Sequence, residues 1–149
     1  MKKNVLMAFI LSSILLTSAA IACTKSLISL GTIIVAPRSQ NGISLSKLQR
    51  HIDYNVVCGI NSSNDENADG IVVGFGTTAV SGANGDFIFN GTNVGPIVTY
   101  YQRPLIPEQK NILIAQRLHS WNRMLNFIDT SASASLKVTC NATPNPTVR

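Results

Sequence analysis

Charged residues are scarce in this chain of 149 residues: Asp, Glu, Lys and Arg together make up 13% of it, and aromatic residues another 6%. The formal net charge is +5, but the 12 basic residues are scattered along the sequence. Because no basic stripe is present to follow a phosphate backbone, we do not expect the protein to bind nucleic acid.

Catalytic and metal-binding motifs are also missing. No serine stands in a Gly-x-Ser-x-Gly nucleophile motif, and neither of the two histidines, His51 and His119, is at metal-ligand spacing from a cysteine. Asp53 or Asp129 could in principle complete a Ser-His-acid arrangement, but an exposed or a structural histidine is favoured at both positions. We therefore expect no catalytic residues, no metal, no cofactor and no enzymatic activity.

The sequence has no apolar run long enough to span a membrane. Its longest one, from Val5 to Leu16, follows Lys2 and Lys3 and is followed by small residues that end at Ala22. A basic start, an apolar stretch and a small-residue cleavage site are typical of a secretory signal. We predict that residues 1–22 are removed and that the mature protein reaches the periplasm or the cell surface.

The chain has only three cysteines, Cys23, Cys58 and Cys140, so one is left over once a disulfide forms. With Cys23 as a free amino-terminal residue, we expect a Cys23–Cys58 disulfide. If Cys23 is instead lipidated, as the residue after a cleaved signal can be, only Cys58–Cys140 is available. The second case would make the protein a membrane-anchored lipoprotein of the cell envelope.

Short apolar runs separated by Gly, Asn and Pro predict an all-β fold, either a sandwich or a barrel. Gly31 interrupts the first run and indicates either a β-bulge or a close approach of another backbone. The second strand is predicted from the alternation of Ile52, Tyr54, Val56 and Cys58. Further strands are expected at residues 71–75, 87–89 and 94–101.

The segment from Pro107 to Ile128 is ambiguous. Its apolar residues recur at spacings of four and three, which fits a helix, but two strands, residues 111–118 and from 127 onward, fit as well. Alternation from Ile128 to Cys140 predicts one final strand, and residues 141–149 are predicted to be a flexible tail. The domain itself is therefore expected at residues 23–140.

Several of these pieces together resemble the pilin subunits of chaperone–usher fimbriae, including the branch of spore coat protein U. The likeness lies in Cys23 and Leu30-Gly31 on the first strand, in Tyr54 to Cys58, and in Val73-Gly74-Phe75-Gly76-Thr77. It continues in residues 113–118 and in the final strand, residues 129–139.

The resemblance implies an immunoglobulin-like β-sandwich that is one strand short, with an acceptor groove between its first and last strands. A periplasmic chaperone, and then a neighbouring pilin subunit, would fill this groove by β-strand addition at an outer-membrane usher. Groove-lining residues would come from the first strand and the last strand: Leu27, Leu30, Ile33, Ala132, Ala134, Leu136 and Val138.

The chain departs from that family in one respect that affects function. Family members carry a donor segment before the first cysteine, whereas cleavage after Ala22 leaves none. We therefore expect a minor or terminal structural subunit of a surface fimbria or a spore-coat-like assembly. The alternative is an envelope lipoprotein whose β-sandwich binds a ligand through its loops.

Two further groups of residues are candidates for binding. Asp65, Asn67 and Asp69 precede Gly70 with the opening spacing of a calcium loop, but Gly76 stands where the bidentate glutamate belongs, which favours a solvated turn. Three aromatic residues could line a glycan or receptor site, although core positions are favoured for them: Tyr100, Tyr101 and Trp121.

Overall fold

The protein is built from β-strands in two antiparallel sheets. A computed structural model describes residues 26–62, 70–78, 85–107, 109–119 and 124–145, and no helix occurs in these ranges. The ten strands are β1 (Ile28–Val35), β2 (Gln40–Ser44), β3 (Asp53–Ser62), β4 (Val72–Thr77), β5 (Asp86–Phe89), β6 (Thr92–Pro96), β7 (Tyr101–Pro104), β8 (Asn111–His119), β9 (Met124–Asp129) and β10 (Leu136–Asn145). The predicted all-β class is confirmed.

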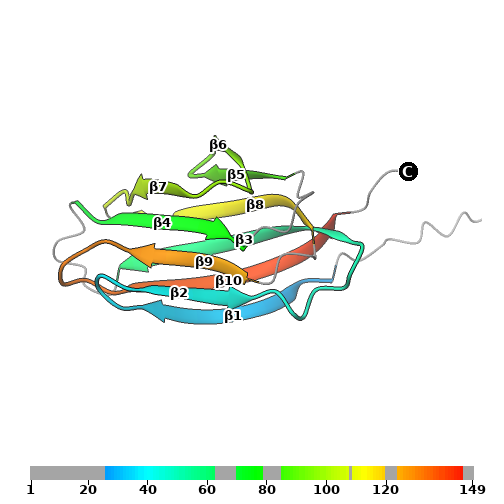
Figure 1. Cartoon of the computed structure of the whole chain (residues 1–149), viewed down its shortest axis with the longest axis horizontal. Helices are drawn as coiled ribbons and strands as arrows, with labels where there is room; N and C mark the ends of the chain where they lie inside the picture. Colours follow the sequence, from blue (N-terminus) through cyan, green and yellow to red (C-terminus); the bar gives the residue numbers. More distant parts are fainter. Residues whose placement is uncertain (1–25, 63–69, 79–84, 108, 120–123, 146–149) are drawn as a thin grey trace, which may run out of the picture.

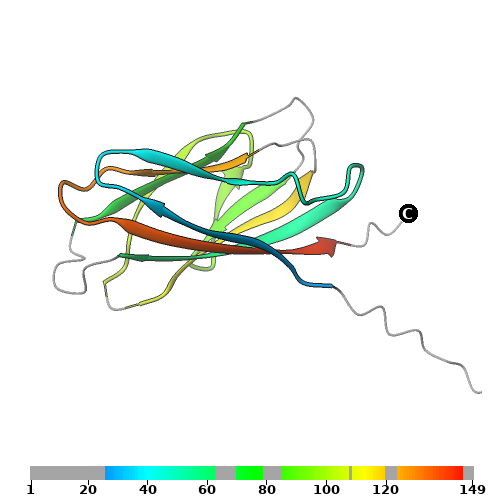
Figure 2. The same cartoon turned by 90° about the horizontal axis from the view of Figure 1, so that it is seen from below.

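The two sheets form the layers of a sandwich (Figure 1). One sheet has six strands in the order β1-β10-β3-β8-β5-β6, and the other has four in the order β2-β9-β4-β7. Strand β1 is an edge strand of the six-stranded sheet with β10 as its neighbour, and in Figure 2 it is the blue strand that crosses in front of the orange-red β10. The first and last strands are thus neighbours within one sheet.

Alternating apolar residues from both sheets fill the space between the layers. Tyr54, Val56 and Cys58 on β3 are all buried, as their spacing predicts. The largest contributions from the other sheet are Phe75 and Phe127, and Phe75 contacts the Phe87 ring edge-on with ring centroids 5.2 Å apart. This single core ties the two sheets into one unit.

The segment from Pro107 to Ile128 contains two strands, β8 and β9, so the helical alternative is wrong and the strand alternative is confirmed. The helix-like spacing joins apolar residues of both strand faces: Leu118 and Leu125 are buried, whereas Ile114 and Ile128 lie on the outward face and are only partly buried. A bulge between β3 and β8 places Arg117 at φ 53°, so that Ala115 and Leu118 both face the core although they are three residues apart.

The predicted single strand from Ile128 to Cys140 is also wrong. β9 ends at Asp129, and residues 130–135 cross to the other sheet before β10 begins. Polar side chains satisfy the backbone of this crossing: the Thr130 hydroxyl donates to the Val72 carbonyl (2.9 Å) and the Ser131 hydroxyl to the Ala134 carbonyl (2.6 Å). Small, alternating residues concealed a turn inside an apparent strand.

Strand β10 continues to Asn145, so residues 141–145 are not the flexible tail that the sequence predicts. Residues 146–149 lie outside the described ranges, as do the predicted signal at residues 1–22 and Cys23. Ala142 is fully buried and lies opposite Val56 of β3, which explains why the pairing extends beyond Cys140.

Candidate functional site

The junction of β1 and β10 is where the sequence places a functional groove. The two strands pair antiparallel over seven residue pairs, from Ile28 opposite Ala142 to Val35 opposite Leu136. The bulge predicted at Gly31 is confirmed, with an irregularity between Ser29 and Gly31 and a φ of 109° at the glycine. Because the strands are hydrogen-bonded neighbours, no open groove separates them.

The predicted groove residues divide into two groups. Leu30, Ala134, Leu136 and Val138 are buried and Ile33 is partly buried against them, so these residues belong to the core. Leu27 precedes β1 and is 68% exposed, and Ala132 is exposed in the turn between β9 and β10. The structure therefore brings β1 and β10 together, but as paired strands that share a core face.

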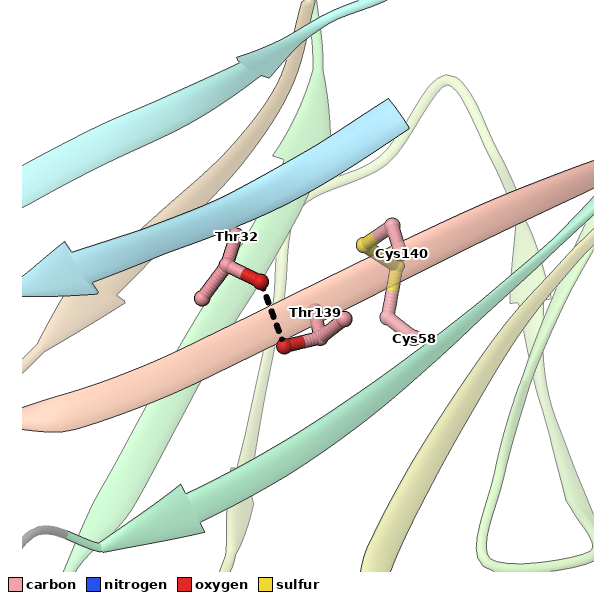
Figure 3. Close-up of a disulfide and its surroundings, with 4 residues drawn as sticks. All are labelled: Thr32, Cys58, Thr139 and Cys140. Atoms are coloured by element: carbon pink, nitrogen blue, oxygen red, sulfur yellow. Dashed lines mark hydrogen bonds between the residues drawn. A yellow bond between two sulfur atoms is a disulfide. The ribbon is translucent and has the colours of Figure 1, made fainter. Parts of the chain in front are cut away.

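The disulfide joins Cys58 of β3 to Cys140 of β10 (Figure 3). The two residues lie directly opposite each other in the sheet, with Cα atoms 4.1 Å apart, and both are fully buried. The Cys23–Cys58 pairing expected for a free Cys23 is thus wrong, because the register of β3 and β10 gives Cys58 a partner inside the core. Cys23 becomes the odd cysteine.

Strand β1 carries no covalent link to its neighbour. On its outward face the Thr32 hydroxyl lies 2.9 Å from that of Thr139 on β10 (Figure 3). Its free edge is covered by side chains: Lys47 Nζ donates to the Ser29 carbonyl (3.0 Å) and Asn41 Nδ2 to the Ile34 carbonyl (2.9 Å). Covered carbonyls protect an edge strand from adding a further strand on that side.

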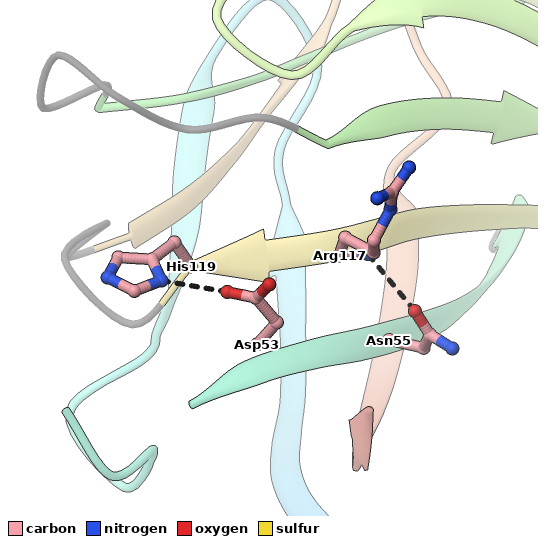
Figure 4. A network of polar contacts seen from close by, with 4 residues as sticks. All are labelled: Asp53, Asn55, Arg117 and His119. Carbon is pink, nitrogen blue, oxygen red and sulfur yellow. Dashed lines mark hydrogen bonds and ion pairs between the residues drawn. The ribbon is translucent and has the colours of Figure 1, made fainter. Parts of the chain in front are cut away.

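The only histidine–carboxylate pair in the described ranges lies at one end of β3 and β8 (Figure 4). His119 Nδ1 is 2.8 Å from Asp53 Oδ1, and the two residues are directly opposite each other in the sheet. Nearby, the Arg117 backbone N–H donates to Asn55 Oδ1 (3.0 Å), which satisfies the bulged backbone. These contacts hold two strand ends together, which supports the predicted structural role of His119.

The second histidine, His51, lies in the turn before β3 with a φ of 66°. The predicted calcium loop falls mainly outside the described residues, since Asp65, Asn67 and Asp69 are not among them. Gly76 belongs to β4. No cluster of three His, Cys, Asp or Glu side chains suited to a metal is found in the part of the chain that the structure describes.

The core contains two buried polar side chains, Asn111 and Asp129, among the described residues. The sequence does not single out Asn111, and it offers Asp129 only as a possible catalytic acid. Asn111 accepts hydrogen bonds from the Ile106 N–H (2.8 Å) and from Asn90 Nδ2 (2.9 Å), and it donates to the Ile106 and Gln109 carbonyls (3.2 Å each). Asn90 and Gly91 form the β5–β6 turn at φ 47° and 82°, as an Asn-Gly hairpin turn requires. Asn111 thus anchors this hairpin to the loop before β8.

Asp129, one of the two acids that could serve a Ser-His-acid arrangement, is fully buried at the end of β9. Its Oδ1 accepts a hydrogen bond from the Ser131 N–H (2.8 Å), whereas its Oδ2 has no hydrogen-bond partner in the structure. No basic side chain forms an ion pair with it within the described ranges. It caps the turn that follows β9, and His119 pairs with Asp53 instead.

The predicted aromatic candidates separate into core and surface. Tyr101 is partly buried among Phe75 and Phe87, with ring centroids 6.1 Å from each, and its hydroxyl donates to the Pro96 carbonyl (3.2 Å). Tyr100 is 42% exposed and lies over Gly74 and Gly76 on the outside of β4. The sequence feature that indicates an aromatic ring packed on the strand is the pair Gly74 and Gly76, which lie two residues apart and so share one face of β4. Trp121 lies outside the described residues.

Comparison with known proteins adds no family to this description: no family model, no curated protein and no solved structure matches the chain. Among the described residues there is also no helix of the length and hydropathy that crossing a membrane requires.

Proposed function

We propose that the protein is a non-enzymatic structural subunit of a surface fimbria or a spore-coat-like assembly, in which β1 is the strand exchanged between neighbouring copies. It would be exported through its signal, held by a periplasmic chaperone, and delivered to the cell surface through an outer-membrane usher. The observation that carries the proposal is the position of β1, a terminal edge strand paired antiparallel with the last strand and free of the disulfide.

If β1 leaves, the disulfide in the rest of the sandwich stays intact. The disulfide links β3 to β10, so the strand that β1 covers stays fixed to the next strand of the sheet. The pilin-type incompleteness expected from the resemblance then corresponds to the fold without β1. The acceptor groove would be the place that β1 occupies, beside Leu136 and Val138 of β10, instead of a space between the first and last strands.

An empty acceptor would be unstable. Leu30 and Val35 of β1 are 8% and 0% exposed, and burying such side chains contributes about 1.5–3 kcal/mol each. Loss of β1 would also uncover the β10 residues opposite Ile33 and Val35 and unpair the backbone along that edge. Such a fold needs a strand from somewhere, either its own or that of a neighbour or chaperone.

Strand exchange also explains how the subunit could donate a strand without the donor segment that the pilin family carries before its first cysteine. If β1 is itself the donor, each copy can accept one strand and give one, and no extra residues before Cys23 are needed. The contacts made within one chain would be remade between two chains, as in domain swapping. The cover that Lys47 and Asn41 provide on the outer edge of β1 directs any strand addition to the β10 side.

A mixed-chain disulfide experiment tests the exchange. In a Cys23→Ser background, one tagged chain carries Thr32→Cys and a second, differently tagged chain carries Thr139→Cys, and both are co-expressed under oxidising conditions. Because Thr32 and Thr139 face each other across β1 and β10, exchange predicts a disulfide between the two chains.

The matched control carries Thr143→Cys in place of Thr139→Cys. Thr143 lies on the same outward side of β10 as Thr139, but it is beyond Ala142, the last β10 residue that pairs with β1. This pair should give no more than background cross-linking. Equal cross-linking by both pairs, or none by the Thr32–Thr139 pair, would rule out exchange of β1.

A second function, that of an envelope lipoprotein, is favoured by one observation. Cys58–Cys140 is the disulfide that remains available when Cys23 is acylated. Intact-mass spectrometry of the mature protein separates the two proposals, since a diacylglyceryl adduct on Cys23 supports the lipoprotein and an unmodified Cys23 excludes it.

A further inference from the structure

The outer face of the four-stranded sheet has an unusual composition. We call it the glycine face, after the residues around which it is formed: Gly42, Gly74, Gly76, Asn126, Ile128 and Gln102. Register fixes their common side, because Asn126 lies opposite both Gly42 and Gly76, while Gly74 lies opposite both Ile128 and Gln102. The inward-facing neighbours Val73, Phe75 and Phe127 are fully buried.

Tyr100 lies on this face in a seat that the glycines make. Its ring extends along β4 from Gly76 to Gly74, so that a Cβ added to Gly76 would lie 3.1 Å from the ring, and one added to Gly74 would overlap the phenol. The residue nevertheless stays 42% exposed. A ring held on bare backbone, with its remaining surface in water, is positioned as a flat contact surface.

Two amide side chains share the outward side of the sheet with the ring, since Gln102 lies opposite Gly74 and Asn126 opposite Gly76. Gln102 is exposed and Asn126 partly exposed. No hydrogen bond from either side-chain amide or from the Tyr100 hydroxyl is found within the described residues, whereas the buried Asn111 uses its amide fully. Each free amide offers both donors and an acceptor, which matches hydroxyl groups that also donate and accept.

No charged side chain lies on this face among the strand residues that the structure describes. Among β2, β4, β7 and β9 the only charged residues are Arg103 and Asp129, and both lie opposite Val73, whose side chain points into the core. Arg103 instead lies over the Tyr101 ring, 5.8 Å from its centroid. An uncharged face disfavours nucleic acid, anionic lipid and acidic polysaccharide as partners.

We propose that the glycine face binds a neutral saccharide, with the Tyr100 ring against the C–H face of a sugar and the Asn126 and Gln102 amides on its hydroxyls. Aromatic contact area with a few polar groups beside it is the usual composition of small-ligand sites. Met124 and Ile128 also lie on this side of β9, so a second copy of the chain is the competing occupant that the experiment below has to exclude. The site is independent of strand exchange.

Titration calorimetry of the purified protein with maltohexaose, cellohexaose, chitohexaose and mannohexaose tests the proposal. At least one of these oligosaccharides should bind, and Tyr100→Ala should weaken that binding tenfold or more. Tyr100→Phe, which keeps the ring, should bind within about threefold of the unaltered protein. Gly74→Ala should weaken binding like Tyr100→Ala, because the added methyl group displaces the ring from its seat.

Val57→Ala on the outer face of the other sheet is the control and should leave binding unchanged, since Val57 is exposed there. Thermal unfolding of each variant verifies that it is folded. If none of the four saccharides binds the unaltered protein, or if Tyr100→Ala binds as tightly as the unaltered protein does, the proposal is overturned.

Discussion

The disulfide between Cys58 and Cys140 should supply a large share of the stability of the sandwich. Its removal is best made with Cys58→Ala and Cys140→Ala together, in a Cys23→Ser background, so that no thiol is left to form another bridge. Both cysteines are fully buried, and alanine leaves no unsatisfied polar group at either position.

The expected magnitude follows from the length of chain that the bond closes. The two cysteines are 82 residues apart, and closing a loop of that length in the unfolded chain corresponds to ~4.5 kcal/mol in the chain-entropy treatment. Native disulfides in secreted domains contribute about 2–5 kcal/mol. We therefore expect the free energy of unfolding to fall by about 3–5 kcal/mol, out of a total of roughly 5–15 kcal/mol for a protein domain.

Urea denaturation of the triple variant and of Cys23→Ser alone measures this difference. The single variant is the control, and its midpoint should match that of the unaltered protein, because Cys23 does not take part in the disulfide. A loss below about 1 kcal/mol in the triple variant would refute the reasoning. So would a peptide map of the unaltered protein in which Cys58 is joined to Cys23.

Other buried or constrained residues yield further predictions for equilibrium unfolding. Asn111→Ala should lower the free energy of unfolding by about 2–3 kcal/mol, because the Ile106 N–H and Asn90 Nδ2 lose their acceptor; an unchanged urea midpoint would contradict the network. Asp129→Ala should lower it by about 1–2 kcal/mol, because the Ser131 N–H loses its acceptor in the turn after β9; an unchanged urea midpoint would show that this cap contributes nothing. Gly91→Ala should lower the thermal midpoint, at a cost of about 1 kcal/mol, because its φ of 82° disfavours a side chain, whereas Thr92→Ala beside it should have little effect.

Sequence pattern predicted the fold where side chains alternate without interruption. Strand β3 is predicted by the alternation of Tyr54, Val56 and Cys58, and the irregularity of β1 by Gly31, because both signals are local in the sequence. The pattern is ambiguous over β8 and β9, because the outward Ile114 and Ile128 combine with the buried Leu118 and Leu125 into a helix-like spacing. The bulge at Arg117 adds to this by setting the buried Ala115 and Leu118 three residues apart. Local irregularities of this kind depend on the partner strand.

The features that sequence reasoning missed are those that depend on which strands are neighbours. Cys58 and Cys140 pair because β3 and β10 are adjacent in register, and nothing local to either cysteine indicates this. The turn at residues 130–135 exists because β9 and β10 belong to different sheets, which the alternation of small residues does not indicate. In the same way, the seat of Tyr100 needs β4 and the β6–β7 connection to be placed together before Gly74 and Gly76 acquire a meaning.

Strand exchange requires β1 to leave the β10 of its own chain when subunits assemble. An engineered disulfide between β1 and β10 of one chain tests this requirement most directly. In a Cys23→Ser background, one chain carries both Thr32→Cys and Thr139→Cys, which face each other across the two strands. Light scattering after gel filtration then compares the oxidised double variant with a control. The control carries Thr32→Cys alone in the same Cys23→Ser background, with its thiol alkylated so that it cannot form a disulfide. We predict that the oxidised double variant stays monomeric while the control forms oligomers; oligomers of the same size from both would contradict the account.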